Sequence, residues 1–178
     1  MVRYLITFIC LALNGAVQAQ NPSQHGIELD ALPWLSGGYY ISGWYGEAHV
    51  KYRALAAKLN VPGQLLADGF KDKQIAAYAL IVDYFPNVNF TGAWYGAGFE
   101  YWRSKISNTS DNTQADYDNT VFTVGLGYVW RISDSLYLNP WAALHMVVSG
   151  DEDITVGNNT YHQDTVTPSG SIKLGWEF

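Results

Sequence analysis

Along most of this chain, apolar side chains alternate with small or polar ones at every second residue. Between Phe122 and Ile132, for example, the even-numbered residues are apolar, whereas the odd-numbered ones include Gly125 and Gly127. Successive side chains of a β-strand point to opposite faces, so this period of two predicts strands with one apolar face. A helix would spread the same polar residues around most of its circumference. The alternation therefore favours an all-β fold.

Six segments show this alternation clearly. They cover residues 42–55, 74–84, 93–105, 122–132, 138–149 and 171–178. The connections between them alternate in length, because 85–90 and 133–135 are short, whereas 108–120 and 150–164 are long and rich in Asp and Asn. Short turns on one side and long loops on the other are typical of β-barrels that span a membrane.

The composition supports a membrane barrel over other apolar folds. Hydrophobic residues make up 48% of the chain and charged residues only 15%, which is below the roughly 25% charged residues of soluble domains. After the first twenty residues, no stretch approaches the ~18 consecutive apolar residues of a transmembrane helix. The polar faces mix glycines with ionisable groups, which suits a narrow lumen better than the water-facing surface of a soluble sandwich. We therefore predict an antiparallel closed transmembrane β-barrel.

The number of strands follows from the smallest familiar barrels of this kind, which have eight. Six of the eight are clearly readable, so we expect the missing pair between Gly38 and Phe70. One strand would arise from a split near Gly46, and the other would lie within residues 61–70. Pro62 and Gly63 favour an alternative for that second piece, namely an outer loop with a short helix.

The N-terminus has the form of a secretory signal peptide. A positive charge at Arg3 precedes an almost wholly apolar run from Tyr4 to Leu13, and Ala19 supplies the small residue that a signal peptidase requires. Cleavage after Ala19 removes Cys10, so the mature chain holds no disulfide, which fits a bacterial envelope protein. The predicted regions are a signal peptide over 1–19, a periplasmic lead-in segment over 20–37 and the β-barrel domain over 38–178.

The signal peptide, the alternating aromatic strands and the final strand from Lys173 to Phe178 resemble those of the small outer-membrane β-barrel proteins of Gram-negative bacteria. In that class a C-terminal aromatic residue is read by the barrel assembly machinery, and Phe178 stands in that position. The resemblance implies a location in the bacterial outer membrane, with outer-membrane lipid and the barrel assembly machinery as partners. The net charge of −6 becomes −7 once Arg3 is removed, so we expect no nucleic-acid partner.

Acids and bases occur in equal numbers on the predicted inward faces. Because buried charges need partners, the sequence predicts a salt-bridged interior in which Asp83 and Glu100 are the partners of Arg53 and Lys51. The alternative is a narrow pore or a small-ligand pocket near Glu47, His49, Lys51 and Arg53. The predicted lumen-facing cluster comprises Glu47, His49, Lys51, Arg53, Asp83, Glu100, Arg131, His145, Lys173 and Glu177.

No catalytic constellation is evident in the sequence. The lipid-modifying enzymes of this class carry a His-x-Ser arrangement on one strand, which neither His49 nor His145 has. Ser149 shares a strand face with His145, but four residues along a strand span roughly 13 Å, which is too far for proton transfer. We therefore expect that the chain is not an enzyme, and an enzyme acting on envelope lipid is the third alternative.

Metal binding is not expected either. The histidines, among them His25 and His162, are scattered along the chain, and the acidic run at 151–153 lacks the glycine spacing of a calcium loop. We therefore predict no metal and no cofactor. The function predicted from the sequence is a structural or surface-interaction role for the barrel, with a surface ligand that the sequence does not identify.

Overall fold

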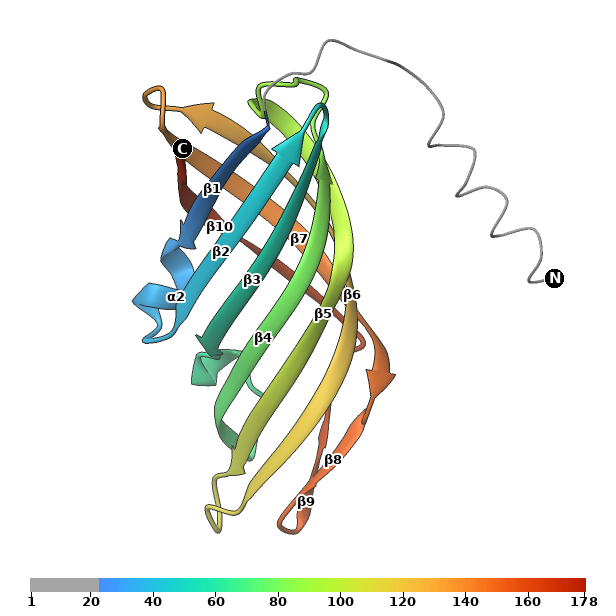
Figure 1. Cartoon of the computed structure of the whole chain (residues 1–178). Helices are drawn as coiled ribbons and strands as arrows, with labels where there is room; N and C mark the ends of the chain where they lie inside the picture. The colour runs from blue at the N-terminus through green and yellow to red at the C-terminus, as the bar shows by residue number, and fades with distance from the viewer. Residues whose placement is uncertain (1–22) are drawn as a thin grey trace, which may run out of the picture.

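The computed structural model describes residues 23–178, so the predicted signal peptide and its cleavage site at Ala19 lie outside the described residues. Eight strands form a closed barrel in the order β1-β10-β7-β6-β5-β4-β3-β2, and β1 closes the ring by pairing with β2 (Figure 1). All of these pairs are antiparallel. The predicted fold, an antiparallel closed β-barrel of eight strands, is therefore confirmed.

The strands lengthen from the first to the sixth, and two short helices and one hairpin lie in three of the connections between them. The barrel strands are β1 (Gln24–Asp30), β2 (Tyr39–Glu47), β3 (Val50–Asn60), β4 (Phe70–Tyr84), β5 (Gly92–Asn108), β6 (Gln114–Arg131), β7 (Leu136–Gly150) and β10 (Val166–Glu177). The other elements are the helix α2 (Ala31–Leu35), the 3-10 helix η2 (Gly63–Leu65) and the hairpin of β8 (Asp153–Val156) with β9 (Asn159–His162).

The two ends of the barrel differ in their connections (Figure 1). One end, which we name the turn end, carries the β2–β3, β4–β5 and β6–β7 connections together with Phe178, whose amide bonds to His25 O of β1 at 3.0 Å. The opposite end, the loop end, carries α2, η2 and the β8–β9 hairpin. Buried residues on β5 and β6, including Ile106 and Tyr117, pack against Val156 and Tyr161 and so hold this hairpin on the barrel.

The barrel carries an apolar belt on its outside and buries charged side chains in the lumen, the inverse of a soluble protein. Charged side chains such as Lys51, Arg53 and Lys173 are buried in the lumen. The exposed outward residues include Ile27, Leu29, Ile41, Tyr45, Tyr52, Leu80, Val82, Tyr95, Phe99, Leu126, Tyr128, Leu144, Ile172 and Leu174. A closed barrel with such a belt presents its apolar face to lipid, so the strands span a membrane.

Across residues 23–178, no helix has both the length and the apolar character needed to cross a membrane.

Of three local predictions, one was confirmed and two were wrong in whole or in part. Residues 24–30 form β1, a wall strand, and not part of a periplasmic lead-in. The split near Gly46 is real, because Ala48 and His49 turn the chain between β2 and β3. The region 61–70 contains η2 in a loop, which is the alternative interpretation, and no additional strand. The missing pair of strands therefore came from β1 and from the split.

Candidate functional site

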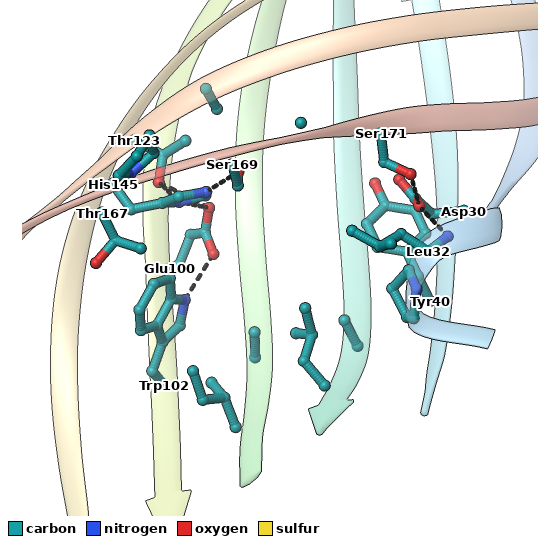
Figure 2. Close-up of a pocket in the computed structure, with 18 of the residues that line it drawn as sticks. Asp30, Leu32, Tyr40, Glu100, Trp102, Thr123, His145, Thr167, Ser169 and Ser171 are labelled. Carbon is teal, nitrogen blue, oxygen red and sulfur yellow. Dashed lines mark hydrogen bonds and ion pairs between the residues drawn. The ribbon is translucent and has the colours of Figure 1, made fainter. Parts of the chain in front are cut away.

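The loop-end half of the lumen contains a cavity of about 660 Å³. Its walls are mostly apolar and include Leu55, Leu59 and Ile75, while Pro62 and Leu66 border it at the loop end. Inward positions on β3 and β4 supply these residues because every second side chain of a strand faces the lumen. Two groups of polar side chains interrupt the apolar lining, one on each side of the view in Figure 2.

The first polar group, which we name the histidine row, crosses four adjacent strands. Glu100 on β5, Thr123 on β6, His145 on β7 and Ser169 on β10 all line the cavity. His145 Nε2 lies 2.6 Å from Ser169 Oγ, and His145 Nδ1 lies 2.9 Å from Thr123 Oγ1 and 3.2 Å from Glu100 Oε1 (Figure 2).

Two further hydrogen bonds fix the carboxylate of the histidine row. Thr123 Oγ1 donates to Glu100 Oε1 at 2.7 Å, and Trp102 Nε1 donates to Glu100 Oε2 at 2.7 Å. Glu100 and His145 are buried, whereas Ser169 is half-buried. The serine is therefore the most accessible member of a row whose other polar members are held in place.

The second polar group lies where α2 leaves β1. Asp30 accepts a hydrogen bond from Ser171 Oγ at 2.6 Å (Figure 2) and another from Trp141 Nε1 at 2.7 Å. The same carboxylate accepts from the Leu32 amide at 3.0 Å and so caps the first turn of α2. Asp30 therefore ties the helix at the loop end to the wall of the cavity.

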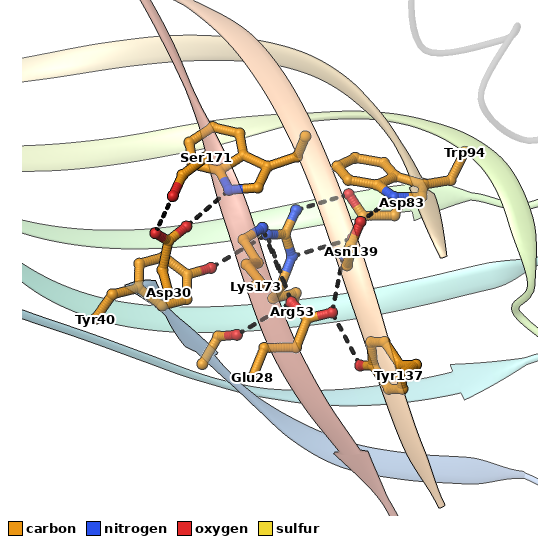
Figure 3. Close-up of polar contacts among 12 residues, drawn as sticks. Glu28, Asp30, Tyr40, Arg53, Asp83, Trp94, Tyr137, Asn139, Ser171 and Lys173 are labelled. Atoms are coloured by element: carbon orange, nitrogen blue, oxygen red, sulfur yellow. Dashed lines mark hydrogen bonds and ion pairs between the residues drawn. The ribbon is translucent and has the colours of Figure 1, made fainter. Parts of the chain in front are cut away.

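The cavity ends on a network of buried polar residues that fills the middle of the lumen (Figure 3). Arg53 donates to Asp83 through Nε at 3.1 Å and through Nη2 at 3.0 Å. Glu28 Oε2 lies 3.8 Å from Lys173 Nζ and 4.0 Å from Arg53 Nη1. We name this network the plug, and its members are Glu28, Arg53, Asp83, Tyr137, Asn139 and Lys173.

Neutral donors complete the plug. Tyr137 OH and Asn139 Nδ2 donate to Glu28 Oε1 at 2.9 and 3.1 Å, and Trp94 Nε1 donates to Asn139 Oδ1 at 2.9 Å (Figure 3). Each of the buried carboxylates in the plug thus has both a cation and hydrogen bonds, as burial of charge requires.

An aromatic cluster closes the lumen between the plug and the turn end. Its buried members are Trp44, Phe85, Phe90, Trp94, Val129 and Tyr137. Lys51 Nζ lies 4.0 Å from the centroid of the Trp44 ring and 4.8 Å from that of Phe85, so this cation is held by aromatic faces. Glycines make the room, because a Cβ at Gly175 would overlap the Tyr137 ring.

The predicted lumen-facing cluster divides into three parts. Lys51, Arg53, Asp83, Glu100, His145 and Lys173 are buried in the lumen. Arg131 and Glu177 pair at 2.6 Å near the turn end, where both are only partly buried. Glu47 is exposed and His49 lies in the turn, where Nδ1 is 2.8 Å from Phe85 O.

The prediction was therefore wrong for Glu47 and His49, and the reason is geometric. Residues paired across a hairpin share a face, and Glu47 pairs with Val50, so the inward positions change from even numbers on β2 to odd numbers on β3. The predicted partners were also only partly right. Asp83 pairs with Arg53, but Glu100 belongs to the histidine row.

Glu28 and Asp30 are the main site residues that the sequence analysis missed. Both are buried and both lie on β1. The signal was present, since Ile27 and Leu29 alternate with these acids, but the strand is too short to stand out by periodicity alone. Within residues 23–178, no group of three or more His, Cys, Asp and Glu side chains is arranged to hold a metal ion.

No protein-family model and no curated protein matches this chain. Among solved structures, the N-terminal β-barrel domain of Pseudomonas aeruginosa OprF is similar with a TM-score of 0.58 and 13% identity, covering 90% of this chain and 100% of that one. Neisserial surface protein A (NspA) is similar with a TM-score of 0.51 and 10% identity, covering 90% of this chain and 98% of that one. The chain therefore has the fold of the small outer-membrane β-barrels, as the sequence resemblance predicted.

Proposed function

We propose that this protein is a bacterial outer-membrane barrel that binds a small, largely apolar ligand in the loop-end half of its lumen and does not conduct. The observation that carries the proposal is the cavity of about 660 Å³, which ends on the plug. Ligand pockets of ~300–1,000 Å³ are typical of small-molecule sites, and most are apolar with a few polar groups that orient the ligand.

The chemistry of the lining defines the class of ligand. Leu55, Leu59 and Ile75 offer an apolar wall, while the histidine row offers hydrogen-bonding groups on another side. A ligand with an apolar chain and one polar head would satisfy both surfaces. A strongly charged ligand would leave its charge against the apolar wall, which costs free energy.

The orientation of the barrel follows from its two ends. Outer-membrane barrels have short periplasmic turns and longer extracellular loops. The loop end, with α2, η2 and the β8–β9 hairpin, would then face the outside of the cell. A ligand would enter the cavity from that side.

A binding titration tests the proposal. The protein in lipid nanodiscs is titrated with the fluorescent fatty acid cis-parinaric acid, with empty nanodiscs as the blank and energy transfer from tryptophan as the signal. We expect saturable binding. Ala57→Phe, which places a ring in the cavity, should weaken binding about tenfold or more, equivalent to about 1.4 kcal/mol.

Ala54→Phe is the matched control because Ala54 lies on the same strand but faces outward. It should bind like the wild-type chain. Absence of saturable binding, or equal binding by both variants, would contradict the proposal.

Planar-bilayer conductance separates this function from a pore. The plug and the aromatic cluster fill the lumen between the cavity and the turn end, which supports a barrel that does not conduct. We expect no steady channels from the wild-type protein. Steady channels would favour the narrow pore that the sequence left as an alternative.

A structural or surface-interaction role is the second candidate, and the plug supports it. A buried network of this kind stiffens a barrel whether or not a ligand binds. If the role of the barrel is purely structural, the cavity takes up no ligand, and we expect no saturable binding of cis-parinaric acid. The same titration therefore discriminates between the two candidates.

A further inference from the structure

We propose that Ser169, His145 and Glu100 hydrolyse an ester of the ligand held in the cavity, with Ser169 as nucleophile and His145 as general base. This inference rests on the proposed function, because it requires a ligand in the lumen. It goes beyond the sequence expectation, which considered only pairs of residues on one strand. Ser169 lies on the neighbouring strand β10 and was not part of that comparison.

The distances are those of a serine–histidine–acid triad. Ser169 Oγ lies 2.6 Å from His145 Nε2, and His145 Nδ1 lies 3.2 Å from Glu100 Oε1. A nucleophile within ~2.6–3.2 Å of a base that a third group orients is the arrangement recognised in enzymes of unrelated folds. Ser169 thus contacts one nitrogen of the imidazole and Glu100 the other, as the mechanism requires.

The hydrogen bonds assign the tautomer of His145. Glu100 accepts hydrogen bonds from Trp102 Nε1 on one oxygen and from Thr123 Oγ1 on the other. With Thr123 donating to Glu100, the proton of the imidazole lies on Nδ1, between Thr123 Oγ1 and Glu100 Oε1. Nε2 is then free of a proton and accepts the hydroxyl hydrogen of Ser169.

The strand register explains how the triad forms. Thr123 pairs directly with His145, and His145 pairs with Thr167, two residues before Ser169. Thr123, His145 and Ser169 all face the lumen, where they line the cavity. The serine hydroxyl therefore lies in the cavity lining, next to the space that the apolar wall leaves for an acyl chain.

The reaction balances with water as the only co-reactant. Ser169 Oγ attacks the carbonyl carbon of a carboxylic ester while its proton passes to His145 Nε2. The bond from that carbon to the leaving alcohol breaks, and His145 returns the proton to the alcohol. Water then attacks the acyl-serine, gives one proton to His145 and releases the carboxylic acid, and Ser169 regains its proton.

The role of each residue differs. Ser169 and His145 touch the reacting atoms and are the catalytic residues. Glu100 acts through His145 and is a positioning residue, and Thr123 and Trp102 hold its carboxylate. The apolar lining predicts that esters with longer acyl chains react faster, because the chain then occupies the wall formed by Leu55 and Ile75.

The test uses the full mature chain in lipid nanodiscs with p-nitrophenyl acetate, hexanoate and octanoate. We expect kcat/KM to rise with chain length. Ser169→Ala should lower kcat at least about 10³-fold, and Glu100→Gln should lower kcat about 10²-fold or more with KM unchanged. Ser149→Ala is the matched control, because Ser149 is exposed on the strand of His145, and it should retain wild-type activity.

Covalent labelling of the wild-type chain needs no variant. An alkyl fluorophosphonate should modify Ser169, identified by mass spectrometry of the digested protein. Hydrolysis that survives in Ser169→Ala, or a wild-type chain that neither hydrolyses these esters nor is labelled, would overturn the triad.

The two proposals can fail separately. A wild-type chain that binds cis-parinaric acid but shows no hydrolysis and no labelling refutes the triad and leaves the ligand site standing. A chain that does not bind the fatty acid at all refutes the ligand site.

Discussion

Replacement of Arg53 by leucine tests whether the plug holds the barrel together. Arg53 lies at the centre of the plug, with 6% of its side chain exposed, and its partner Asp83 is 3% exposed. Arg53 donates two hydrogen bonds to the Asp83 carboxylate, at 3.1 and 3.0 Å. Leucine removes both bonds and the positive charge together, so the Asp83 carboxyl is left buried without its partner.

The expected loss of unfolding free energy follows from that burial. Removal of one partner of a buried ion pair costs about 3–5 kcal/mol, because the group that remains is buried without its hydrogen bonds and its nearest opposite charge. Glu28 is affected less, since Tyr137, Asn139 and Lys173 remain beside it. The double variant Arg53→Leu/Asp83→Leu should recover most of the loss, because no charge is then left unpaired.

The assay is urea-induced unfolding in lipid vesicles, followed by tryptophan fluorescence, with heat-modifiability on gels as a check that each variant is folded. Arg103→Leu is the control, because Arg103 pairs with Asp118 at 3.8 Å with side chains 67% and 54% exposed. A surface pair of this kind contributes at most about 1 kcal/mol. Equal losses for Arg53→Leu and Arg103→Leu, or a double variant no more stable than Arg53→Leu, would refute the reasoning.

Three further predictions concern a glycine, the C-terminus and export. Gly175→Ala should destabilise the barrel by ~1–3 kcal/mol in the same unfolding assay, because its Cβ would overlap the buried Tyr137 ring, whereas Gly43→Ala, with nothing within 4 Å, should not. Phe178→Ala should slow assembly in a pulse-chase followed by heat-modifiability while leaving the unfolding midpoint unchanged, because Phe178 is exposed at the barrel edge. Mass spectrometry of the exported protein should show a chain that begins at Gln20, and an intact Met1 would contradict cleavage after Ala19.

The inward and outward faces of most strands could be predicted from the sequence. On β4, for example, Tyr78, Leu80 and Val82 are exposed while Ala79 and Ile81 are buried, as the alternation indicated. Alternation works because the direction of a side chain in a strand depends only on its own position in the pleat. The same local rule failed between β2 and β3, where Ala48 turns the chain with a φ of 54°. Asn or Gly is the usual signal for such a turn, so an alanine there gives no warning.

Aromatic residues near the turn end lie on two different surfaces of the barrel. Tyr84, Tyr128 and Trp130 are exposed on the outside, as a membrane-interface girdle requires. Phe85 and Phe90, by contrast, are buried and fill the lumen near the turn end. Both belong to the turn 85–91, where the period of two no longer applies.

By itself, the sequence determined the class of fold, the belt that faces lipid and the charged character of the lumen, because each of these depends on which face of its own strand a residue occupies. Only the tertiary structure decided which lumen residues meet. Glu28 bonds to Asn139, 111 positions away, and His145 meets a serine 24 positions further along. Such contacts depend on the tilt and stagger of strands around a closed ring, and no local pattern encodes that geometry.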